Sequence, residues 1–301
     1  MKSSLVVIVV FALAHHPTIA QNKAGKLAGF LDQETPTVKP AIFAPGLVSL
    51  KDEYEFGSVF SNDGNEFYYA VNVGPIAEIR CIKRKGGKWS KPITVITNDK
   101  YSHNDPFLSP DDNKLFFISD RPMDGAGEKK DYDIWYMERT GDRWSSPINA
   151  GPSINTNQNE YYVSFSKRGT IYFASNGRSS AVDNNNYEIC SAEASGKDFK
   201  EAQTLPETIN TSSYEADVYV APDESYLIFC ADRQDGIGKG DLYISFKLKD
   251  NSWSKSKNMG NVINTSEHEL CPFVTNDGKY FFFTSNKDIY WVDAKVIETM
   301  R

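Results

Sequence analysis

SPDDNKLFFISDR, Ser109–Arg121, places a turn directly before a strand, and this combination decides the fold of the chain. Pro, Asp and Asn favour tight turns, because Asp and Asn side chains bond their own backbone. The aromatic and β-branched residues that follow favour a strand. Related segments begin at residues 61, 166, 221 and 275, so the steps between starts are 48, 57, 55 and 54 residues. The sequence therefore contains five repeats of about 55 residues.

Each repeat also contains shorter strand-like elements. One is like YDIWYME, which begins at Tyr132, and one is a hairpin with an aromatic residue, like RWSSP from Arg143. An element with the letters INT follows, as in SINTNQNE from Ser153. Four short strands per period, separated by turn signals, are typical of a β-propeller blade. We therefore expect an all-β propeller, in which stacked blades bury each other's faces.

The two ends of the chain predict how the ring closes. The fifth repeat stops at Arg301 after its third strand, and PAIFAPGLVSLKDEYE (Pro40–Glu55) parallels SPINAGPSINTNQNE (Ser146–Glu160). We expect Ala41–Ala44 to form the outermost strand of the last blade, which would hide two unpaired strand edges. This count predicts five four-stranded blades, and six blades are the alternative.

The N-terminal segment MKSSLVVIVVFALAHHPTIAQ has the layout of a secretory signal peptide. Its unbroken apolar run, Leu5–Ala14, has ten residues, whereas a membrane span needs about 20. We expect a signal peptide over residues 1–20 that is cleaved after Ala20, a polar leader over 21–39 and the propeller over 40–301. The mature protein would be periplasmic or secreted and would not span a membrane. An uncleaved anchor is the alternative.

Composition limits the partners. The formal net charge is −7, and no block of Lys and Arg offsets it, which argues against nucleic acid. No two cysteines have C-x-x-C spacing, so we favour small buried thiols, although export would permit disulfides. We expect a monomer. The cysteines are Cys81, Cys190, Cys230 and Cys271.

The repeats resemble a known family. SPDDNKLFFISDR followed by YDIWYMERTGDRWSSPINAGPSINTNQNE is similar to the WD40-like propeller repeat of TolB-type bacterial envelope proteins, and the resemblance covers Glu55–Arg301. It implies a non-catalytic periplasmic interaction module. The partner would be an envelope protein or a glycan.

Charged residues recur where the second strand of a repeat gives way to the third. They fit one structural ion pair per blade, or a cluster of Arg donors that grips an anionic ligand, since guanidinium binds carboxylates bidentately. We favour the structural interpretation, because each Arg has an acid nearby in the sequence. The predicted pairs are Arg121 with Asp133, Arg178 with Glu188, and Arg233 with Asp241.

The start of the innermost strand is the best candidate for a binding site. If these strands line a channel, one mouth carries a ring of carboxylates that would suit a hard cation such as Ca²⁺ or a basic partner. Alternatively, these acids bond neighbouring backbone amides and lock blade to blade. The candidate residues are Glu55, Asp105, Glu160, Tyr162, Glu215, Asp217 and Glu269, and His103 takes the glutamate position in the second repeat.

Catalytic motifs are weak. The chain contains no G-x-S-x-G, no H-E-x-x-H and no phosphate-binding loop, and only His103 and His268 would remain after export. We therefore expect a protein- or glycan-binding module with no cofactor. The alternative is a carbohydrate-active propeller hydrolase of the glycosidase or sialidase kind. Such an enzyme needs two carboxylates about 5–10 Å apart in an open pocket.

Overall fold

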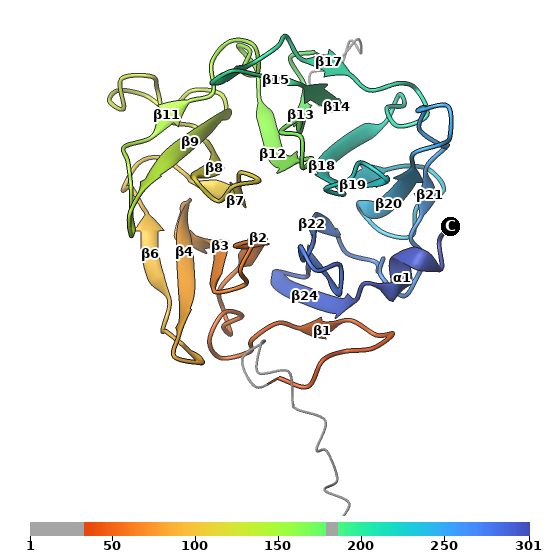
Figure 1. Ribbon diagram of the computed structural model, residues 1–301, viewed down its shortest axis with the longest axis horizontal. Helices are drawn as coiled ribbons and strands as arrows, with labels where there is room; N and C mark the ends of the chain where they lie inside the picture. Colours follow the sequence, from red (N-terminus) through yellow and green to blue (C-terminus); the bar gives the residue numbers. More distant parts are fainter. Residues whose placement is uncertain (1–32, 179–185) are drawn as a thin grey trace, which may run out of the picture.

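The structure is a β-propeller. The computed structural model describes residues 33–178 and 186–301, and within them five small antiparallel sheets stand around a central axis (Figure 1). The predicted signal peptide lies outside the described residues, as does the leader up to residue 32. The predicted all-β fold with five blades is confirmed, and the six-bladed alternative is not what forms.

Each blade is one sheet whose strands follow the chain outward from the axis, except that the N-terminal strand completes the fifth blade. Blade 1 contains β2 (Glu55–Phe60), β3 (Glu66–Val73), β4 (Ile76–Lys85), β5 (Lys88–Trp89) and β6 (Ile93–Ile96). Blade 2 contains β7 (Asn104–Leu108), β8 (Lys114–Ser119), β9 (Asp133–Thr140), β10 (Arg143–Trp144) and β11 (Ile148–Asn149). Blade 3 contains β12 (Glu160–Phe165), β13 (Ile171–Ser175), β14 (Glu188–Ala192) and β17 (Gln203–Thr204), with a small hairpin of β15 (Ala194–Ser195) and β16 (Asp198–Phe199). Blade 4 contains β18 (Tyr214–Val220), β19 (Tyr226–Asp232), β20 (Asp241–Phe246) and β21 (Lys257–Asn258). Blade 5 contains β22 (Leu270–Val274), β23 (Tyr280–Ser285), β24 (Asp288–Asp293) and β1 (Ala41–Ile42).

The N-terminal strand closes the ring as predicted. β1 pairs antiparallel with β24, Ala41 opposite Trp291 and Ile42 opposite Tyr290, and the two strands lie side by side in Figure 1. The Phe43 amide adds one more bond to the Ile289 carbonyl (2.8 Å). The strand is shorter than the predicted Ala41–Ala44, because Ala44 adopts a positive φ of 48° and turns the chain away.

The outer edge of β1 is covered by a side chain. The Gln33 amide donates to the Ile42 carbonyl (3.3 Å) and accepts from the Ala44 amide (2.7 Å). These two backbone groups face away from β24, so they would otherwise be an open strand edge. Gln33 therefore takes the place of a further strand.

The closing segment also fills the core between the first and last blades. Phe43 is fully buried, and its ring centroid lies 4.9 Å from Phe67 and 6.1 Å from Phe60 in blade 1. It lies 5.0 Å from Phe282 and 5.5 Å from Trp291 in blade 5. Most of these pairs are edge-to-face, the geometry that aromatic rings prefer.

The repeated turns are held by their own side chains. The Ser109 hydroxyl donates to the Asp111 carboxylate (2.6 Å), which also accepts the Asn113 amide (3.1 Å). Ser61 and Thr275 make the same bond to Asp63 and Asp277, at 2.7 Å each. The SPDD-type motif recurs because it builds this turn, which is a structural role.

The four cysteines are buried and form no disulfide. Burial raises the pKa of the Cys81 and Cys190 thiols to about 12, so these thiols stay protonated and unreactive at neutral pH. This agrees with the predicted role of the cysteines as small buried side chains.

Helical structure in the described part of the chain is limited to α1 (Lys295–Glu298), which follows β24. None of the described residues forms a helix with the length and hydropathy needed to cross a membrane.

We predict that Phe43→Ala destabilises the whole propeller. Removing a buried Phe leaves a cavity and costs about 3–5 kcal/mol. This loss would appear as a lower midpoint in urea unfolding with an unchanged m-value. The matched control is Ile93→Ala, because Ile93 is 48% exposed and its loss should cost less than about 0.5 kcal/mol. Equal effects of the two substitutions would contradict the role of Phe43 in ring closure.

Candidate functional site

The five innermost strands share one backbone distortion near the axis. Each of β2, β7, β12, β18 and β22 contains a register shift in its pairing with the next strand. At that point one residue adopts a positive φ of 44–53°, which is rare for residues other than Gly, Asn and Asp. These residues are Gly57, Asp105, Tyr162, Asp217 and Cys271, and each lies two residues after Glu55, His103, Glu160, Glu215 or Glu269 in its repeat.

The distortion aims side chains from different blades at one another. The Cys271 thiol of blade 5 donates to the Asp105 carboxylate of blade 2 (3.4 Å). Gly57 of blade 1 lies so close that a Cβ there would be 2.7 Å from an Asp105 oxygen. A side chain at position 57 would therefore collide with the carboxylate, whatever its chemistry.

Two carboxylates interact inside this layer. Asp105 is 6% exposed, and Asp217 keeps partial exposure. Burial and the neighbouring Asp217 carboxylate raise the pKa of Asp105 to about 8. Burial also raises the pKa of Asp217, to about 6. Both carboxyl groups therefore hold a proton more tightly than an exposed aspartate does, and Asp105 shows the larger effect.

Tyr162 crosses the axis. Its hydroxyl donates to the Pro272 carbonyl (2.8 Å), which joins blade 3 to blade 5, and the side chain is 1% exposed. The ring fills the space between the innermost strands. This part of the axis is packed like a core and is not an open channel.

Half-buried tyrosines lie around the start of the innermost strands. Ring centroids are 5.1 Å apart for Tyr132 and Tyr161, 5.5 Å for Tyr161 and Tyr187, and 5.5 Å for Tyr187 and Tyr214. Burial raises the pKa of both Tyr161 and Tyr214. The Asp217 carboxylate lies near enough to raise the pKa of both phenols further, and Asp105 adds to this effect at Tyr161. A tyrosine row therefore covers the carboxylate pair.

The four predicted glutamates are fully buried and bond to the loop that precedes their own strand. Glu160 accepts the Thr156 amide (2.9 Å), the Thr156 hydroxyl (2.8 Å) and the Ser175 hydroxyl (2.7 Å). The amide and hydroxyl of Thr211 donate to Glu215, and those of Thr265 donate to Glu269. Glu55 accepts the Leu50 amide. The predicted acidic ring therefore divides: Asp105 and Asp217 meet at the axis, and the glutamates satisfy the INT loops.

The arginine contacts differ from the predicted pairs. Arg178 lies 3.8 Å from Glu160 and Arg233 lies 2.9 Å from Glu215, so both approach a glutamate of the first strand. The predicted partners were Glu188 and Asp241 on the third strand. Asp241 accepts the Gly238 amide (3.0 Å) and the Asn258 side chain (2.6 Å), and in blade 2 Asp133 pairs with Lys130 (2.7 Å).

The tyrosine row lies at the mouth of the propeller where the innermost strands begin. The surface is hollowed at the other mouth, where these strands end in the SPDD-type turns, and we call this the turn-lined mouth. A cavity of about 350 Å³ has an aromatic floor made of Phe107, Phe165, Tyr219 and Phe273. Its rim comes from the second residue of each SPDD-type turn: Asn62, Pro110, Lys167, Pro222 and Asn276. Sequence analysis placed these turns in the repeat but did not identify the cavity, because only the closed ring brings the five turns together.

Hydrogen bonds between blades hold this rim. Asn62 donates to the Pro110 carbonyl (2.9 Å) and accepts from the Asn276 amide group (2.7 Å). On the other side of the mouth the Lys167 amide donates to the Pro222 carbonyl (2.7 Å). The rim is therefore a fixed frame and not a set of independent loops.

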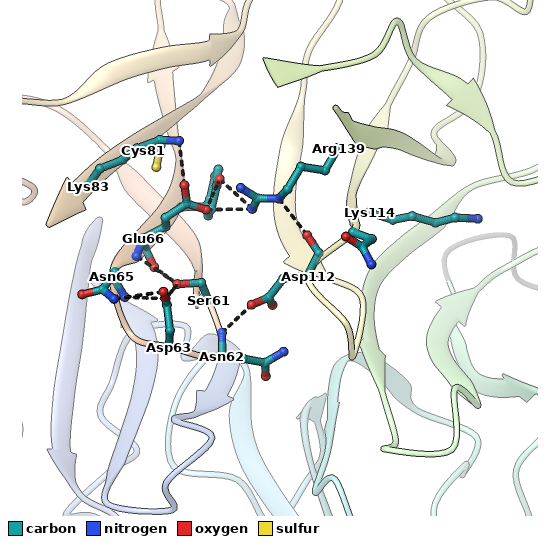
Figure 2. A network of polar contacts seen from close by, with 12 residues as sticks. Ser61, Asn62, Asp63, Asn65, Glu66, Cys81, Lys83, Asp112, Lys114 and Arg139 are labelled. Atoms are coloured by element: carbon teal, nitrogen blue, oxygen red, sulfur yellow. Dashed lines mark hydrogen bonds and ion pairs between the residues drawn. The ribbon is translucent and has the colours of Figure 1, made fainter. Parts of the chain in front are cut away.

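Figure 2 shows the polar network that supports the rim between blades 1 and 2. Glu66 pairs with Lys83 (2.6 Å) and Arg139 (2.7 Å), and Arg139 also donates to the Asp112 carbonyl (2.9 Å). The Asp112 carboxylate accepts the Asn62 amide (2.8 Å). Burial opposes ionisation of Glu66, but the bonds from Arg139 and Lys83 lower its pKa to about 2. The carboxylate of Glu66 therefore stays ionised at neutral pH, and Lys83 and Arg139 are both paired with it.

Within residues 33–178 and 186–301, no group of three or more His, Cys, Asp or Glu side chains is arranged to hold a metal ion. The Ca²⁺ hypothesis stays a prediction from the sequence.

We predict that Asp105 makes the propeller less stable as pH rises. Its raised pKa means that the folded state binds a proton which the unfolded state releases near pH 4, so stability falls between about pH 4 and 8. Asp105→Asn removes this titration and should raise stability at pH 8. The substitution should also reduce the slope of the unfolding free energy against pH by up to about 1.4 kcal/mol per pH unit.

The measurement is urea unfolding of both proteins at several pH values from 5 to 8. Asn suits the site, because it tolerates a positive φ. The control is Asp250→Asn in an exposed turn, which should leave the slope unchanged above pH 5. Identical slopes for Asp105→Asn and the unsubstituted chain would refute the assignment.

Comparisons with known proteins support the fold. No protein-family model matches the chain, and no curated protein has significant sequence similarity to it. Among solved structures, TolB from Acinetobacter baumannii has a TM-score of 0.52 at 12% identity, over 81% of this chain and 55% of that chain. A protein of unknown function from Dyadobacter fermentans has a TM-score of 0.52 at 13% identity, over 86% and 83%. A putative TolB from Agrobacterium tumefaciens has a TM-score of 0.48 at 14% identity, over 79% and 72%.

This chain spans about half the length of the Acinetobacter baumannii TolB that it resembles. At 12–13% identity the similarity concerns the fold. The chain has the β-propeller fold of TolB-type proteins, built here from five blades.

Proposed function

We propose that this protein is an exported, non-catalytic binding module that recognises another envelope protein through the cavity at the turn-lined mouth. The observation that carries the proposal is the cavity itself, about 350 Å³ with an aromatic floor and a polar rim. Ligand sites in proteins usually begin at about 300 Å³ and combine an apolar lining with a few polar groups.

The shape of the cavity favours one bulky apolar side chain as an anchor. The floor rings are 2–7% exposed, so none of them offers an open face on which a sugar ring could stack. Protein interfaces concentrate their binding energy in such pockets, where a rim of polar residues excludes water around a central anchor. A protein partner therefore fits better than a glycan, which commonly stacks a sugar ring on an exposed aromatic face.

The charged residues at the rim favour a partner of particular charge. Lys167 is exposed and lines the cavity, and its ammonium forms no ion pair with any described residue. Asp112, on the blade 2 side, is half-buried and holds the Asn62 amide. A partner with an acidic residue beside its apolar anchor would gain a favourable contact with Lys167.

The axis offers little support for the hydrolase alternative. That mechanism needs two carboxylates that face an open pocket. Asp105 is buried, Tyr162 joins blade 3 to blade 5 across the axis, and Tyr161 and Tyr214 lie near the carboxylate pair. This arrangement favours a binding role.

Export is part of the proposal and rests on the N-terminal sequence. We propose that the mature chain begins at Gln21, resides in the periplasm or outside the cell, and is a monomer.

The test is a pull-down from envelope extract with two matched variants of the mature chain. Lys167→Glu reverses the charge at the cavity rim, and Arg168→Glu makes the same change at the next exposed residue, which does not line the cavity. We expect a protein that is retained by the unsubstituted chain and by Arg168→Glu, and at least tenfold less by Lys167→Glu. Thermal unfolding verifies that both variants are folded.

A glycan array with the same three proteins separates the two partner classes. Glycan binding that is lost only in Lys167→Glu would support the cavity as the binding site but would show that the partner is a glycan and not a protein. Equal retention by both variants, or no retention of any protein or glycan, would refute binding at this cavity.

A further inference from the structure

The repeated blades provide an internal comparison for one arginine position. In blade 4 the guanidinium of Arg233, which follows the second strand, has a complete set of partners. It donates to Glu215 (2.9 and 3.1 Å), to the Ile209 carbonyl (2.7 Å) and to the Ser256 hydroxyl (2.7 Å). Its charge is neutralised inside the protein.

Blade 3 repeats this arrangement with a longer ion pair. Arg178 donates to the Ile154 carbonyl (2.6 Å) and the Ser153 carbonyl (3.0 Å), and it lies 3.8 Å from Glu160. In both blades the INT loop supplies the carbonyls and the first strand supplies the carboxylate.

Blade 2 lacks both parts of this arrangement. His103 stands at the position of Glu160 and Glu215, and the INT loop is replaced by ITNDKYSHND. The Arg121 guanidinium forms no hydrogen bond and no ion pair with any residue in the described ranges, and its Nε is buried. It lies over the Trp135 ring at 4.9 Å, so the position is held although the charge is not paired.

Two further polar nitrogens in this corner of blade 2 have no partner among the described residues. His103 and Trp135 are each 2% exposed, and neither His103 Nδ1 nor Trp135 Nε1 forms a hydrogen bond. Buried polar groups are nearly always bonded, and each exception needs an explanation. Arg121 Nε, His103 Nδ1 and Trp135 Nε1 can all donate to an oxygen, which points to an acceptor that residues 33–178 and 186–301 do not provide.

The surrounding charges leave Arg121 free for an anion. Burial lowers the pKa of Arg121, and no carboxylate offsets this effect. The acids of this blade are already engaged: Asp120 binds Lys129 (2.8 Å) and the Ser102 amide (2.8 Å). Asp131 and Asp133 each keep one unbonded oxygen, but both pair with Lys130, at 3.4 and 2.7 Å.

We propose that Arg121, His103 and Trp135 form a carboxylate-binding site, in which a ligand supplies the carboxylate that Glu215 supplies to Arg233 in blade 4. Arg121 is half-buried, so part of this residue is open to solvent. The carboxylate would come from an acidic peptide or an acidic sugar. This site lies among the loops between the second and third strands and is independent of the cavity proposed above.

The test is thermal unfolding in sodium acetate, with sodium chloride at equal ionic strength as the reference. A ligand that binds only the folded state raises Tm, by about 3 °C at tenfold its dissociation constant. We expect this acetate-specific rise for the unsubstituted chain and its loss in Arg121→Gln. Arg233→Gln is the control: it should lower Tm in every buffer, because Glu215 loses its partner, but it should keep the acetate-specific rise.

His103→Glu tests the comparison between blades directly. A glutamate at position 103 would supply the carboxylate from within, so the acetate-specific rise should disappear. If this variant does not fold, His103→Gln serves instead, and it should keep most of the rise because Arg121 is unchanged. An acetate effect no larger than the chloride effect in the unsubstituted chain, or one that survives Arg121→Gln, would overturn the proposal.

The same assay identifies the source of the carboxylate. An acetylated and amidated Glu peptide and glucuronate are compared as probes, and the one that raises Tm at the lower concentration identifies the ligand class. Either result supports the site, provided that Arg121→Gln abolishes the effect.

Discussion

The pairing of β1 with β24 is the interaction on which the rest of the structure depends. A blade cannot bury both of its faces alone, so each sheet needs a neighbour on either side and the row must return to its start. β1 makes the first and last parts of the chain one sheet, and Phe43 fills the space between blades 1 and 5. Both mouths of the propeller exist only because this closure brings five innermost strands to one axis (Figure 1).

Repetition and variation have different roles in this protein. Bonds that recur in three of the blades, such as the Ser/Thr–Asp bond of the turn and the Thr–Glu bond of the INT loop, hold the fold. The proposed sites use features that change from blade to blade, namely Lys167 at the cavity rim and His103 in place of a glutamate, and the Asp105 and Asp217 pair is likewise confined to two blades. A repeat protein thus contains its own controls, since each exceptional residue can be compared with its counterpart in an ordinary blade.

Most of the fold could be predicted from the sequence, and the candidate sites only in part. Turn chemistry and strand patterns act over a few residues, so the period, the five blades and the closing strand were all accessible. The predicted acidic ring divided, because Glu160, Glu215 and Glu269 turn toward threonines of their own preceding loops. The arginine pairs were predicted from hairpin register, which places the start of the third strand beside the end of the second. The observed pairs differ because the guanidinium of Arg233 is directed toward Glu215 on the first strand.

The sequence by itself determined the architecture of this protein, because a repeated local signal specifies the same strands five times and the ends of the chain complement each other. Only the tertiary structure decided which repeated positions meet. Asp105 and Cys271 are 166 positions apart, and Tyr162 and Pro272 are 110 apart. Their contacts depend on a positive φ at each innermost strand and on ring closure, which no local pattern encodes. The cavity follows from the same long-range geometry, as does the absence of a partner for Arg121 among the described residues, because burial and partners are properties of the closed ring.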